Sequence, residues 1–392
     1  MKNQIINIGL KSKKAFSFQI NSKKKNKVLK DYFHLIKKNK KLIINQNKKD
    51  INNAIKKKIK ENLINRLVLN DKKISEIVNS IKKIIRLKDP TNIILEKWKR
   101  PNGLNISKVS IAIGVIGVIY ESRPNVTSDV ASLCFKSGNS VILKGGSEAF
   151  YSNKILSKLF RESLKKNKVD ENFVQFIAIK KRSVVDFLLT KMKKYIDIII
   201  PRGGKSLVKK VNTLSNVPTI GHLEGVCHSY VDKNANLKIA KNIIYNAKLR
   251  NTSICGATET ILLHEKIIKN IGIPILKDLE KNGCKIIGDK KIKKLYKGKV
   301  QRATEKDWSK EYLSSIVSVK SVKNLDEAIM HINKYGTMHT DCIITQNKKS
   351  AKKFLNEVNS SIAMHNTSTQ FADGGEFGFG GEVGISTNTL PP

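Results

Sequence analysis

The stretch VSIAIGVIGVIYESRPNVTSDVASLCFKSGNSVILK, residues 109–144, decides the fold. It opens with an apolar run that predicts one strand or two strand segments, continues with a helical segment at 128–138, and ends in the buried strand SVILK. Two short apolar strands that are separated by a helix pair in parallel through a right-handed crossover. This stretch therefore predicts the start of a parallel α/β sheet.

The same alternation continues on both sides of this stretch. It runs on through apolar segments at 174–179 and 197–201, and a second series of strands and helices occupies residues 257–366. The first hundred residues are helical in pattern and are expected to pack on the first sheet, and residues 98–107 predict a turn-bearing connection. We expect two Rossmann-like α/β domains with the active site in the cleft between them, because the change from one series to the next lies near residues 221–232.

Composition excludes several classes of protein. The 392 residues suit two domains, and five widely spaced cysteines without a C-x-x-C pair indicate neither a disulfide framework nor a zinc site. The net charge of +43 comes mostly from lysines spread over the helical segments, while aromatic residues make up only 6%. We therefore expect nonspecific attraction to polyanions but no specific nucleic-acid recognition.

Targeting signals are not visible in this sequence. Its start, MKNQIINIGLKSKKAF, lacks an uninterrupted apolar core, and the longest apolar run, residues 109–120, is shorter than the roughly 20 residues that a membrane span needs. Together with the cysteine pattern, this predicts a cytoplasmic protein without a membrane association.

A cysteine lies in the polar stretch NAKLRNTSICGAT, residues 246–258, after a helical pattern and before an apolar strand. Loops on a rigid α/β frame are where reactive groups are held. A lone cysteine is more often a small buried hydrophobe, so on its own this position supports either a nucleophile or a core residue.

Two glycine-containing segments resemble ligand-binding loops. PRGGKS, residues 201–206, is not a P-loop, because Ile199 stands where that motif needs glycine. Its backbone N–H groups and the following helix start suit a phosphate or the nicotinamide side of a cofactor, although a simple tight turn explains it equally well. The segment FADGGEFGFGGEVGIST, residues 371–387, predicts a loop folded against a group that sequence physics does not identify.

Five colinear blocks resemble the γ-glutamyl phosphate reductase family of the aldehyde dehydrogenase superfamily. They are residues 113–149, IIPRGGKSLV (199–208), VPTIGHLEGVCHSYVD (217–232), NAK with CGATETILLH (246–264), and 371–387. The resemblance implies NADPH-dependent reduction of L-glutamyl 5-phosphate to L-glutamate 5-semialdehyde and phosphate, in proline biosynthesis. It also implies an NADP-binding domain at 1–225, with part of residues 100–120 in an oligomerisation hairpin, a catalytic domain at 226–366 and a glycine-rich segment at 367–392.

The resemblance also assigns catalytic roles. Cys255 is the nucleophile that forms a thioester, and the side-chain amide of Asn125 stabilises the oxyanion together with the Cys255 N–H. Without the resemblance, Asn125 would be interpreted as a turn residue after Pro124.

Cofactor contacts follow from the same blocks. Lys144, at the end of a strand, is implied to bind the adenosine ribose and suits the 2′-phosphate of NADPH. Glu311 is implied to hold the nicotinamide ribose, and we add the turn residues Pro201, Gly203 and Gly204. The alternatives are a solvated side chain for Lys144, a surface carboxylate for Glu311 and a simple tight turn at 201–204.

The substrate carries a carboxylate, an ammonium and a phosphate. Arg123 is the expected bidentate donor to an anionic group, and Glu121 and Ser122 are the expected contacts of the ammonium end. Glu224 corresponds either to the general base of the superfamily or to a cofactor contact, and acyl-phosphate reduction needs no activated water.

The other polar side chains near Glu224 are not expected to bind a metal. His222, Cys227 and His228 lack a fourth plausible ligand and are interpreted as site lining or core, so no metal is expected.

The chain departs from the family pattern at three places. Gly256 replaces the asparagine that follows the nucleophile, which predicts a looser oxyanion site, and Gln370 replaces an arginine and removes a cation from the substrate's anionic end. The sequence ends TNTLPP where the family continues with a terminal strand, so we expect a shortened C-terminus that weakens a homo-oligomer.

These departures leave two alternatives open. Beside an active reductase, the chain could be an impaired member that acts as a binding or scaffold protein, or a different acyl-reducing aldehyde dehydrogenase. If it is active, the unstable acyl phosphate must come from a separate glutamate 5-kinase as functional partner.

Overall fold

The computed structural model describes residues 1–59 and 61–387, which form two compact units. Unit 1 comprises residues 1–221 with 380–384, and unit 2 comprises residues 222–379 with the described residues from 385 onward. Residues 388–392 of the expected glycine-rich segment lie outside the described residues. Within the described ranges, no helix combines the length and apolar character that a membrane crossing requires.

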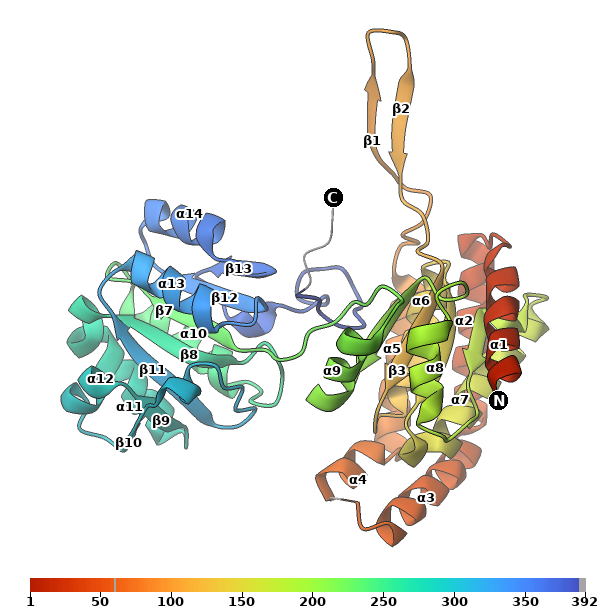
Figure 1. The fold of residues 1–392 in the computed structure, drawn as a ribbon, viewed down its shortest axis with the longest axis horizontal. Helices are drawn as coiled ribbons and strands as arrows, with labels where there is room; N and C mark the ends of the chain where they lie inside the picture. Colours follow the sequence, from red (N-terminus) through yellow and green to blue (C-terminus); the bar gives the residue numbers. More distant parts are fainter. Residues whose placement is uncertain (60, 388–392) are drawn as a thin grey trace. The chain divides into compact units, whose positions relative to one another are not determined.

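Unit 1 contains helices, an antiparallel hairpin and a parallel sheet (Figure 1). Its helices are α1 (Lys2–Phe16), α2 (Ser22–Lys38), α3 (Lys40–Lys56), α4 (Glu61–Leu67), α5 (Asp71–Arg86), α6 (Asn125–Lys136), α7 (Phe150–Lys166), α8 (Ser183–Lys191) and α9 (Lys205–Leu214). Its strands are β1 (Ile94–Lys99), β2 (Asn105–Val109), β3 (Val115–Tyr120), β4 (Ser140–Gly145), β5 (Val174–Phe176) and β6 (Ile198–Arg202).

The sheet of unit 1 is parallel, with the strand order β5-β4-β3-β6. Alternate residues of β3 face opposite sides: Ile116 and Val118 pack under α6 and α7, whereas Val115 and Ile119 pack with α1 and α8. Because both faces are covered, the strands are continuous apolar runs. The strand order reverses between β3 and β6, and such a switch point is where open α/β sheets bind ligands.

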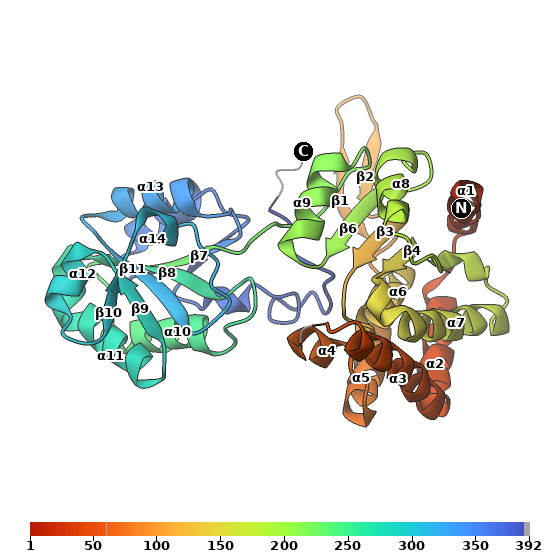
Figure 2. The ribbon, with the colours of Figure 1, turned by 60° about the horizontal axis from the view of Figure 1, so that its bottom comes forward.

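The amino-terminal helices form two layers around this sheet. Helix α1 contacts β4 and β3 directly, whereas α2, α3 and α5 pack on α6 and α7 (Figure 2). The expectation that these helices pack on the sheet is therefore correct for α1. For α2, α3 and α5 it needs correction, because α6 and α7 already cover that face.

Strands β1 and β2 form a hairpin that extends away from the body of unit 1 (Figure 1). The predicted connection at 98–107 was wrong at both ends, because Trp98 pairs with Ile106 in the ladder. Within the range 100–120, residues 105–109 form β2 and residues 115–120 form the core strand β3. The hairpin exposes large apolar side chains, among them Leu95 (61%) and Leu104 (58%).

Unit 2 is built around a second parallel sheet, with the strand order β10-β9-β11-β8-β7-β12-β13. Its strands are β7 (Cys227–Val231), β8 (Thr258–His264), β9 (Lys285–Gly288), β10 (Val300–Arg302), β11 (Ile316–Val322), β12 (Thr340–Ile344) and β13 (Ile362–His365). Its helices are α10 (Leu237–Leu249), α11 (Ile273–Lys281), α12 (Lys290–Leu295), α13 (Leu325–Tyr335) and α14 (Lys348–Glu357).

One edge of this second sheet collects the segments of chemical interest. Strands β8, β7 and β12 are neighbours and parallel, so the loops that precede them meet at the same, amino-terminal edge. These loops carry Cys255, the segment from His222 to Val226, and His339. The fold therefore brings together residues that are far apart in the sequence.

Candidate functional site

Cys255 lies in the loop between α10 and β8, as predicted. Its side chain is half-exposed, whereas the other four cysteines of the chain are buried. The loop turns tightly beside it, because the backbone N–H of Ala257 donates to the carbonyl of Ile254 at 3.0 Å. Cys255 is thus not sealed in an apolar core.

The backbone of Cys255 packs directly on Gly225. A Cβ atom added to Gly225 would lie 2.2 Å from the carbonyl oxygen of Cys255 and 2.8 Å from its Cα, so only glycine fits here. The Cys227 thiol donates to the same carbonyl oxygen at 3.1 Å. The segment that leads into β7 therefore fixes the backbone of the nucleophile loop.

A buried ion pair joins the two ends of this loop. Lys248 Nζ, near the end of α10, lies 2.6 Å from Glu259 Oε2 in β8, and neither side chain is exposed. Glu259 Oε1 also accepts a hydrogen bond from the backbone N–H of Leu313 at 3.1 Å. Burial raises the pKa of Glu259 to about 7, and Lys248 partly offsets this rise.

Gln370, one of the departures from the family pattern, also contacts this loop. Its Nε2 donates to the carbonyls of Ala247 at 2.9 Å and Asn251 at 3.2 Å. These carbonyls belong to the end of α10 and the start of the loop, so Gln370 satisfies groups that the helix end leaves open. Gly256 is buried, and a Cβ there would lie 3.1 Å from the carbonyl oxygen of Thr369.

Two histidines stand beside the cysteine. His222, Cys255 and His339 place one potential ligand atom each so that all three atoms lie within 4.8 Å of one another. Burial, reinforced by the neighbouring His222, lowers the pKa of His339 to about 4, so its imidazole is neutral near pH 7. Because its pKa is so low, His339 is a weak proton acceptor, so a proton from the Cys255 thiol can pass only to His222 or to solvent when the thiolate nucleophile forms.

His228, which follows Cys227, belongs to the core and lies outside this group. It is fully buried in β7, and both its backbone N–H and its Nδ1 lie within 2.9 Å of Asp341 Oδ1. Of the three residues interpreted as site lining or core, His222 lies beside Cys255, whereas Cys227 and His228 are buried.

Glu311 is tied to the nucleophile loop through Gly225. Its Oε1 accepts the backbone N–H of Gly225 at 2.9 Å, and that glycine packs on Cys255. Glu224 is half-buried in the segment before β7. Both residues belong to unit 2, whereas the other predicted cofactor contacts belong to unit 1.

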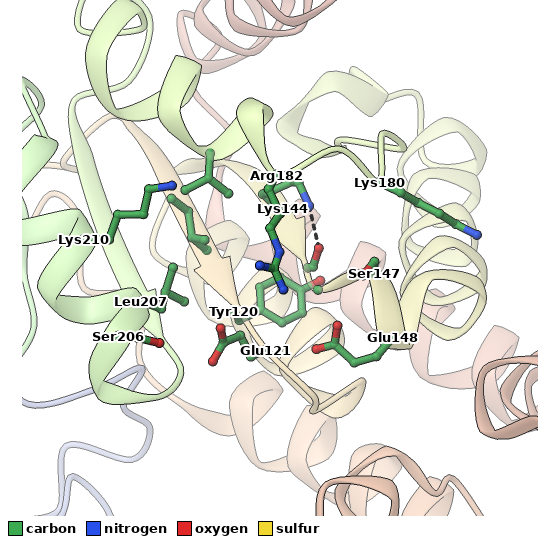
Figure 3. Close-up of a pocket in the computed structure, with 14 residues that line it drawn as sticks. Tyr120, Glu121, Lys144, Ser147, Glu148, Lys180, Arg182, Ser206, Leu207 and Lys210 are labelled. Carbon is green, nitrogen blue, oxygen red and sulfur yellow. Dashed lines mark hydrogen bonds between the residues drawn. The ribbon is translucent and has the colours of Figure 1, made fainter. Parts of the chain in front are cut away.

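Unit 1 contains a cavity of about 320 Å³ at the carboxyl ends of β3 and β4 (Figure 3). Four cationic side chains line it, namely Lys144, Lys180, Arg182 and Lys210. Two carboxylates, Glu121 and Glu148, lie on its other side. Its position at the strand ends and its cationic lining suit a ligand that carries phosphate.

Lys144 is the most buried of these cations, with a 6% exposed surface. Its Nζ donates to the carbonyl of Gly145 at 2.8 Å, and burial lowers its pKa, which Glu148 partly offsets. Figure 3 shows Arg182 next to Lys144, with Lys210 approaching from α9. The sequence predicted Lys144, and the structure adds Arg182, Lys180 and Lys210 to the same cavity.

The turn at 201–204 lies next to this cavity. Pro201 ends the buried part of β6, and Gly204 caps the amino terminus of α9. The N–H of Gly204 donates to Glu121 Oε2 at 2.9 Å, and a Cβ on Gly203 would lie 2.5 Å from that oxygen. Glu121 therefore connects the end of β3 to this turn.

The remaining predicted residues follow β3. Ser122 has a left-handed backbone (φ 47°) and donates to Glu148 Oε1 from both its N–H and its hydroxyl. Arg123 is exposed, yet partial desolvation of its guanidinium lowers its pKa, and the positive charges of Arg66 and Arg202 act in the same direction. Asn125 begins α6, and its amide donates to Asp129 at 3.0 Å.

The structure thus assembles two groups of the predicted residues. Cys255 and Glu311 come together in unit 2, and Glu121, Ser122 and Lys144 come together in unit 1. The pairing of Asn125 with Cys255 stays a prediction, because these residues belong to different units. The sequence missed His339, whose only local signal is a position just before a buried strand.

Comparison with known proteins shows which family and fold this chain shares. The aldehyde dehydrogenase family model matches residues 5–281 and 300–385. The γ-glutamyl phosphate reductase of Bartonella tribocorum is 46% identical over 332 residues, which cover 85% of this chain and 81% of that protein. The crystal structure of γ-glutamyl phosphate reductase from Thermotoga maritima is 40% identical, with a TM-score of 0.94 over 97% of this chain and 92% of that one. An engineered glycolyl-CoA reductase with bound NADP⁺ shares the fold at 15% identity and a TM-score of 0.66, over 99% of this chain and 91% of that one.

Proposed function

Since this chain belongs to the aldehyde dehydrogenase family and, within it, to the γ-glutamyl phosphate reductases, we propose that it reduces L-glutamyl 5-phosphate to L-glutamate 5-semialdehyde with NADPH through a thioester on Cys255. The observation that carries this proposal is the loop of Cys255. The residue is half-buried, while Gly225, Cys227 and the buried ion pair fix its backbone. A reactive group on a rigid support is what covalent catalysis needs.

The chemistry at Cys255 balances without an activated water. The thiolate attacks the acyl carbon, a C–S bond forms, and phosphate leaves with the electrons of the broken C–O bond. The nicotinamide cofactor, when bound, supplies a hydride to that carbon. The resulting thiohemiacetal collapses, the C–S bond breaks, and the aldehyde and the Cys255 thiolate are released.

Both tetrahedral states place a negative charge on the former carbonyl oxygen. We assign its stabilisation to the Cys255 backbone N–H and the Asn125 amide, and the loss of one such donor costs roughly 2.7–4 kcal/mol of barrier. In this scheme Arg123 binds an anionic group of the substrate, and Glu121 and Ser122 serve its ammonium end. Their closeness to Lys144 supports a role near the bound ligands, since all lie at the carboxyl ends of β3 and β4.

NADPH is the proposed form of the nicotinamide cofactor. Four cations line the cavity of unit 1, and Figure 3 draws Lys144 and Arg182 in the same part of it. We assign the 2′-phosphate to this cationic side, with the turn at Gly203 and Gly204 beside it. Glu311 and Glu224 complete the proposed cofactor contacts from unit 2.

The reverse reaction tests this function. Wild-type chain, Cys255→Ser and the matched control Cys284→Ser, a buried cysteine of the same unit, are given glutamate semialdehyde, NADP⁺ and phosphate, and NADPH formation is followed. We expect activity in the wild type and the control, and its loss in Cys255→Ser. Equal rates in all three would refute the thioester on Cys255.

The same assay separates the alternatives. A folded wild-type chain that forms no NADPH with any aldehyde would support a scaffold role. A chain that oxidises simple aldehydes but not glutamate semialdehyde would support a different acyl-reducing dehydrogenase.

We propose that the hairpin β1–β2 takes part in a homo-oligomer. A two-stranded hairpin is marginal on its own, and this one exposes Leu95, Trp98 and Leu104. Burial against another copy would remove these side chains from water. Light scattering on Leu95→Asp, compared with Glu96→Asp at the neighbouring exposed position, tests this, and an unchanged mass would refute it.

The substrate also implies a partner reaction and a compartment. An acyl phosphate hydrolyses readily, so a separate glutamate 5-kinase must supply it, and coupled activity with such a kinase tests this supply. We place the reaction in the cytoplasm, because five cysteines without paired spacing suit a reducing compartment.

A further inference from the structure

The group formed by His222, Cys255 and His339 has a property that thioester chemistry does not use. Its three potential ligand atoms, two imidazole nitrogens and one sulfur, lie within 4.8 Å of one another. The residues come from the loops before β7, β8 and β12, which meet at one edge of the sheet in unit 2. Their supports therefore belong to a single rigid frame.

His222 is oriented by the backbone. Its Nδ1 lies 2.8 Å from the carbonyl oxygen of Ile385, and a carbonyl can only accept, so Nδ1 carries the hydrogen. The Nε2 atom of the neutral ring then carries the lone pair. This is the arrangement in which a histidine binds a metal ion through Nε2 while a carbonyl holds its other nitrogen.

His339 provides the second imidazole and an independent sign of a ligand. It is fully buried, its Nδ1 lies 2.9 Å from the Thr340 hydroxyl, and its Nε2 has no hydrogen-bond partner among the described residues. A buried polar atom left without a partner costs about 1–3 kcal/mol. The ring of His222 meets it edge-on with centroids 4.7 Å apart, so the two rings share one small space.

We propose that His222, Cys255 and His339 form a binding site for a thiophilic divalent cation, Zn²⁺ by its ligand chemistry, and that the bound ion blocks the nucleophile. One thiolate and two imidazoles suit zinc, whereas Mg²⁺ and Ca²⁺ require oxygen ligands. On binding, the S–H bond of Cys255 breaks, a Zn–S bond forms and the proton leaves to solvent, without any oxidation. The fourth position stays open to water.

This site goes beyond the proposed function, because binding needs neither substrate nor cofactor. A sulfur bound to zinc cannot attack an acyl phosphate, so the ion acts as a reversible inhibitor that a chelator removes. It also shields the thiol from alkylating reagents. Both consequences can be measured separately from turnover.

Cobalt(II) is a suitable probe, because tetrahedral cobalt with a thiolate ligand absorbs strongly in the visible and near-ultraviolet. The full chain is titrated with Co²⁺ as wild type, Cys255→Ser, His339→Gln, His222→Ala and the control His365→Ala, an exposed histidine of the same unit. We expect one ion per wild-type chain and an unchanged spectrum in the control. We expect no thiolate band in Cys255→Ser, and at least tenfold weaker binding in each variant of the two site histidines.

Two results would overturn the site: no thiolate-to-cobalt band in the wild type, or the same band in Cys255→Ser. If the buried His339→Gln variant fails to fold, judged by circular dichroism, the half-exposed His222→Ala decides the contribution of the imidazoles.

A second measurement follows alkylation of Cys255 by iodoacetamide, which Zn²⁺ should slow at least tenfold and EDTA should restore. An unchanged alkylation rate would contradict the blocking role. A cobalt band in a chain without reductase activity would refute the proposed function but not the metal site. Reductase activity without a cobalt band would refute the metal site but not the proposed function.

Discussion

Replacement of Lys248 by Met tests how the nucleophile loop is held. Lys248 and Glu259 have no exposed side-chain surface, and their charged atoms lie 2.6 Å apart across the ends of the loop. Methionine keeps much of the lysine volume but removes the ammonium, which leaves a buried carboxylate without its partner. Breaking one side of such a pair costs about 3–5 kcal/mol of unfolding free energy.

The size of this cost should depend on pH, because the carboxyl can take up a proton. Burial already raises the pKa of Glu259 to about 7, and the loss of Lys248 removes the influence that lowers it. A carboxyl with a raised folded-state pKa binds its proton more tightly in the folded chain than in the unfolded one. The free energy of unfolding therefore falls as the pH rises from about 4.5 through the folded-state pKa, by at most ~1.4 kcal/mol per pH unit. In Lys248→Met this fall continues above pH 7, and the variant should be weaker at pH 8.5 than at pH 6.

Differential scanning calorimetry at these two pH values measures the effect. For a unit of this size, 3–5 kcal/mol corresponds to roughly 6–20 °C in the unfolding midpoint. The matched control is Lys241→Met on the same helix, whose partly exposed pair with Asp278 is worth at most ~1 kcal/mol. The double variant Lys248→Met/Glu259→Leu should recover most of the loss, because an apolar pair replaces the buried charges.

Two outcomes would refute this reasoning. One is a shift in Lys248→Met no larger than in Lys241→Met. The other is a double variant as unstable as the single one, which would mean that lost packing, and not an unpaired charge, causes the effect.

Three further predictions follow from other contacts. Gly225→Ala puts a Cβ 2.2 Å from the Cys255 carbonyl oxygen, so the backbone of the nucleophile must move. We expect roughly a 100-fold loss of kcat, with the fold retained as judged by circular dichroism. A kcat within twofold of the wild-type value would contradict this. Arg182→Ala should raise KM for NADPH at least tenfold and leave KM for NADH nearly unchanged. The control Lys154→Ala, at an exposed position, should change neither KM. Equal changes for both cofactors would refute the assignment of the 2′-phosphate to this cavity. Burial, with His228 as the next cause, lowers the pKa of His331 to about 2, so the folded chain resists protonation of this ring and loses stability as the pH falls below about 6.5. His331→Gln should therefore flatten the acid part of a profile of unfolding free energy against pH, measured by urea unfolding. An unchanged slope would exclude His331 as the source of the pH dependence.

The sequence predicted the parts of the fold that are buried on both faces. The strands at 115–120 and 140–145 are continuous apolar runs, and their pattern identifies them without any partner. The two strands of the hairpin, residues 94–99 and 105–109, were not predicted. Neither strand has a buried face, so their apolar and charged residues do not alternate with a two-residue period. Only their pairing with each other makes them strands.

The candidate site divides in the same way. Cys255 and Lys144 are marked by their places at a helix-to-strand loop and at a strand end, which local patterns reveal. His339 has no such mark, since it joins Cys255 only because β12 and β8 both neighbour β7. Strand order cannot be read from spacing, and a group assembled from several loops is therefore invisible before the sheet is known.

The departures at positions 256 and 370 have a different meaning once the loop's supports are known. From the sequence alone, Gly256 is expected to loosen the backbone and Gln370 to remove a cation from the substrate's anionic end. The loop, however, is positioned by neighbours outside it: Gly225 packs on Cys255, and the amide of Gln370 binds carbonyls at the loop's start. A Cβ at position 256 would lie 3.1 Å from the Thr369 carbonyl oxygen, so a side chain there would crowd this backbone, and the contacts of Gly225 and Gln370 hold the loop without one.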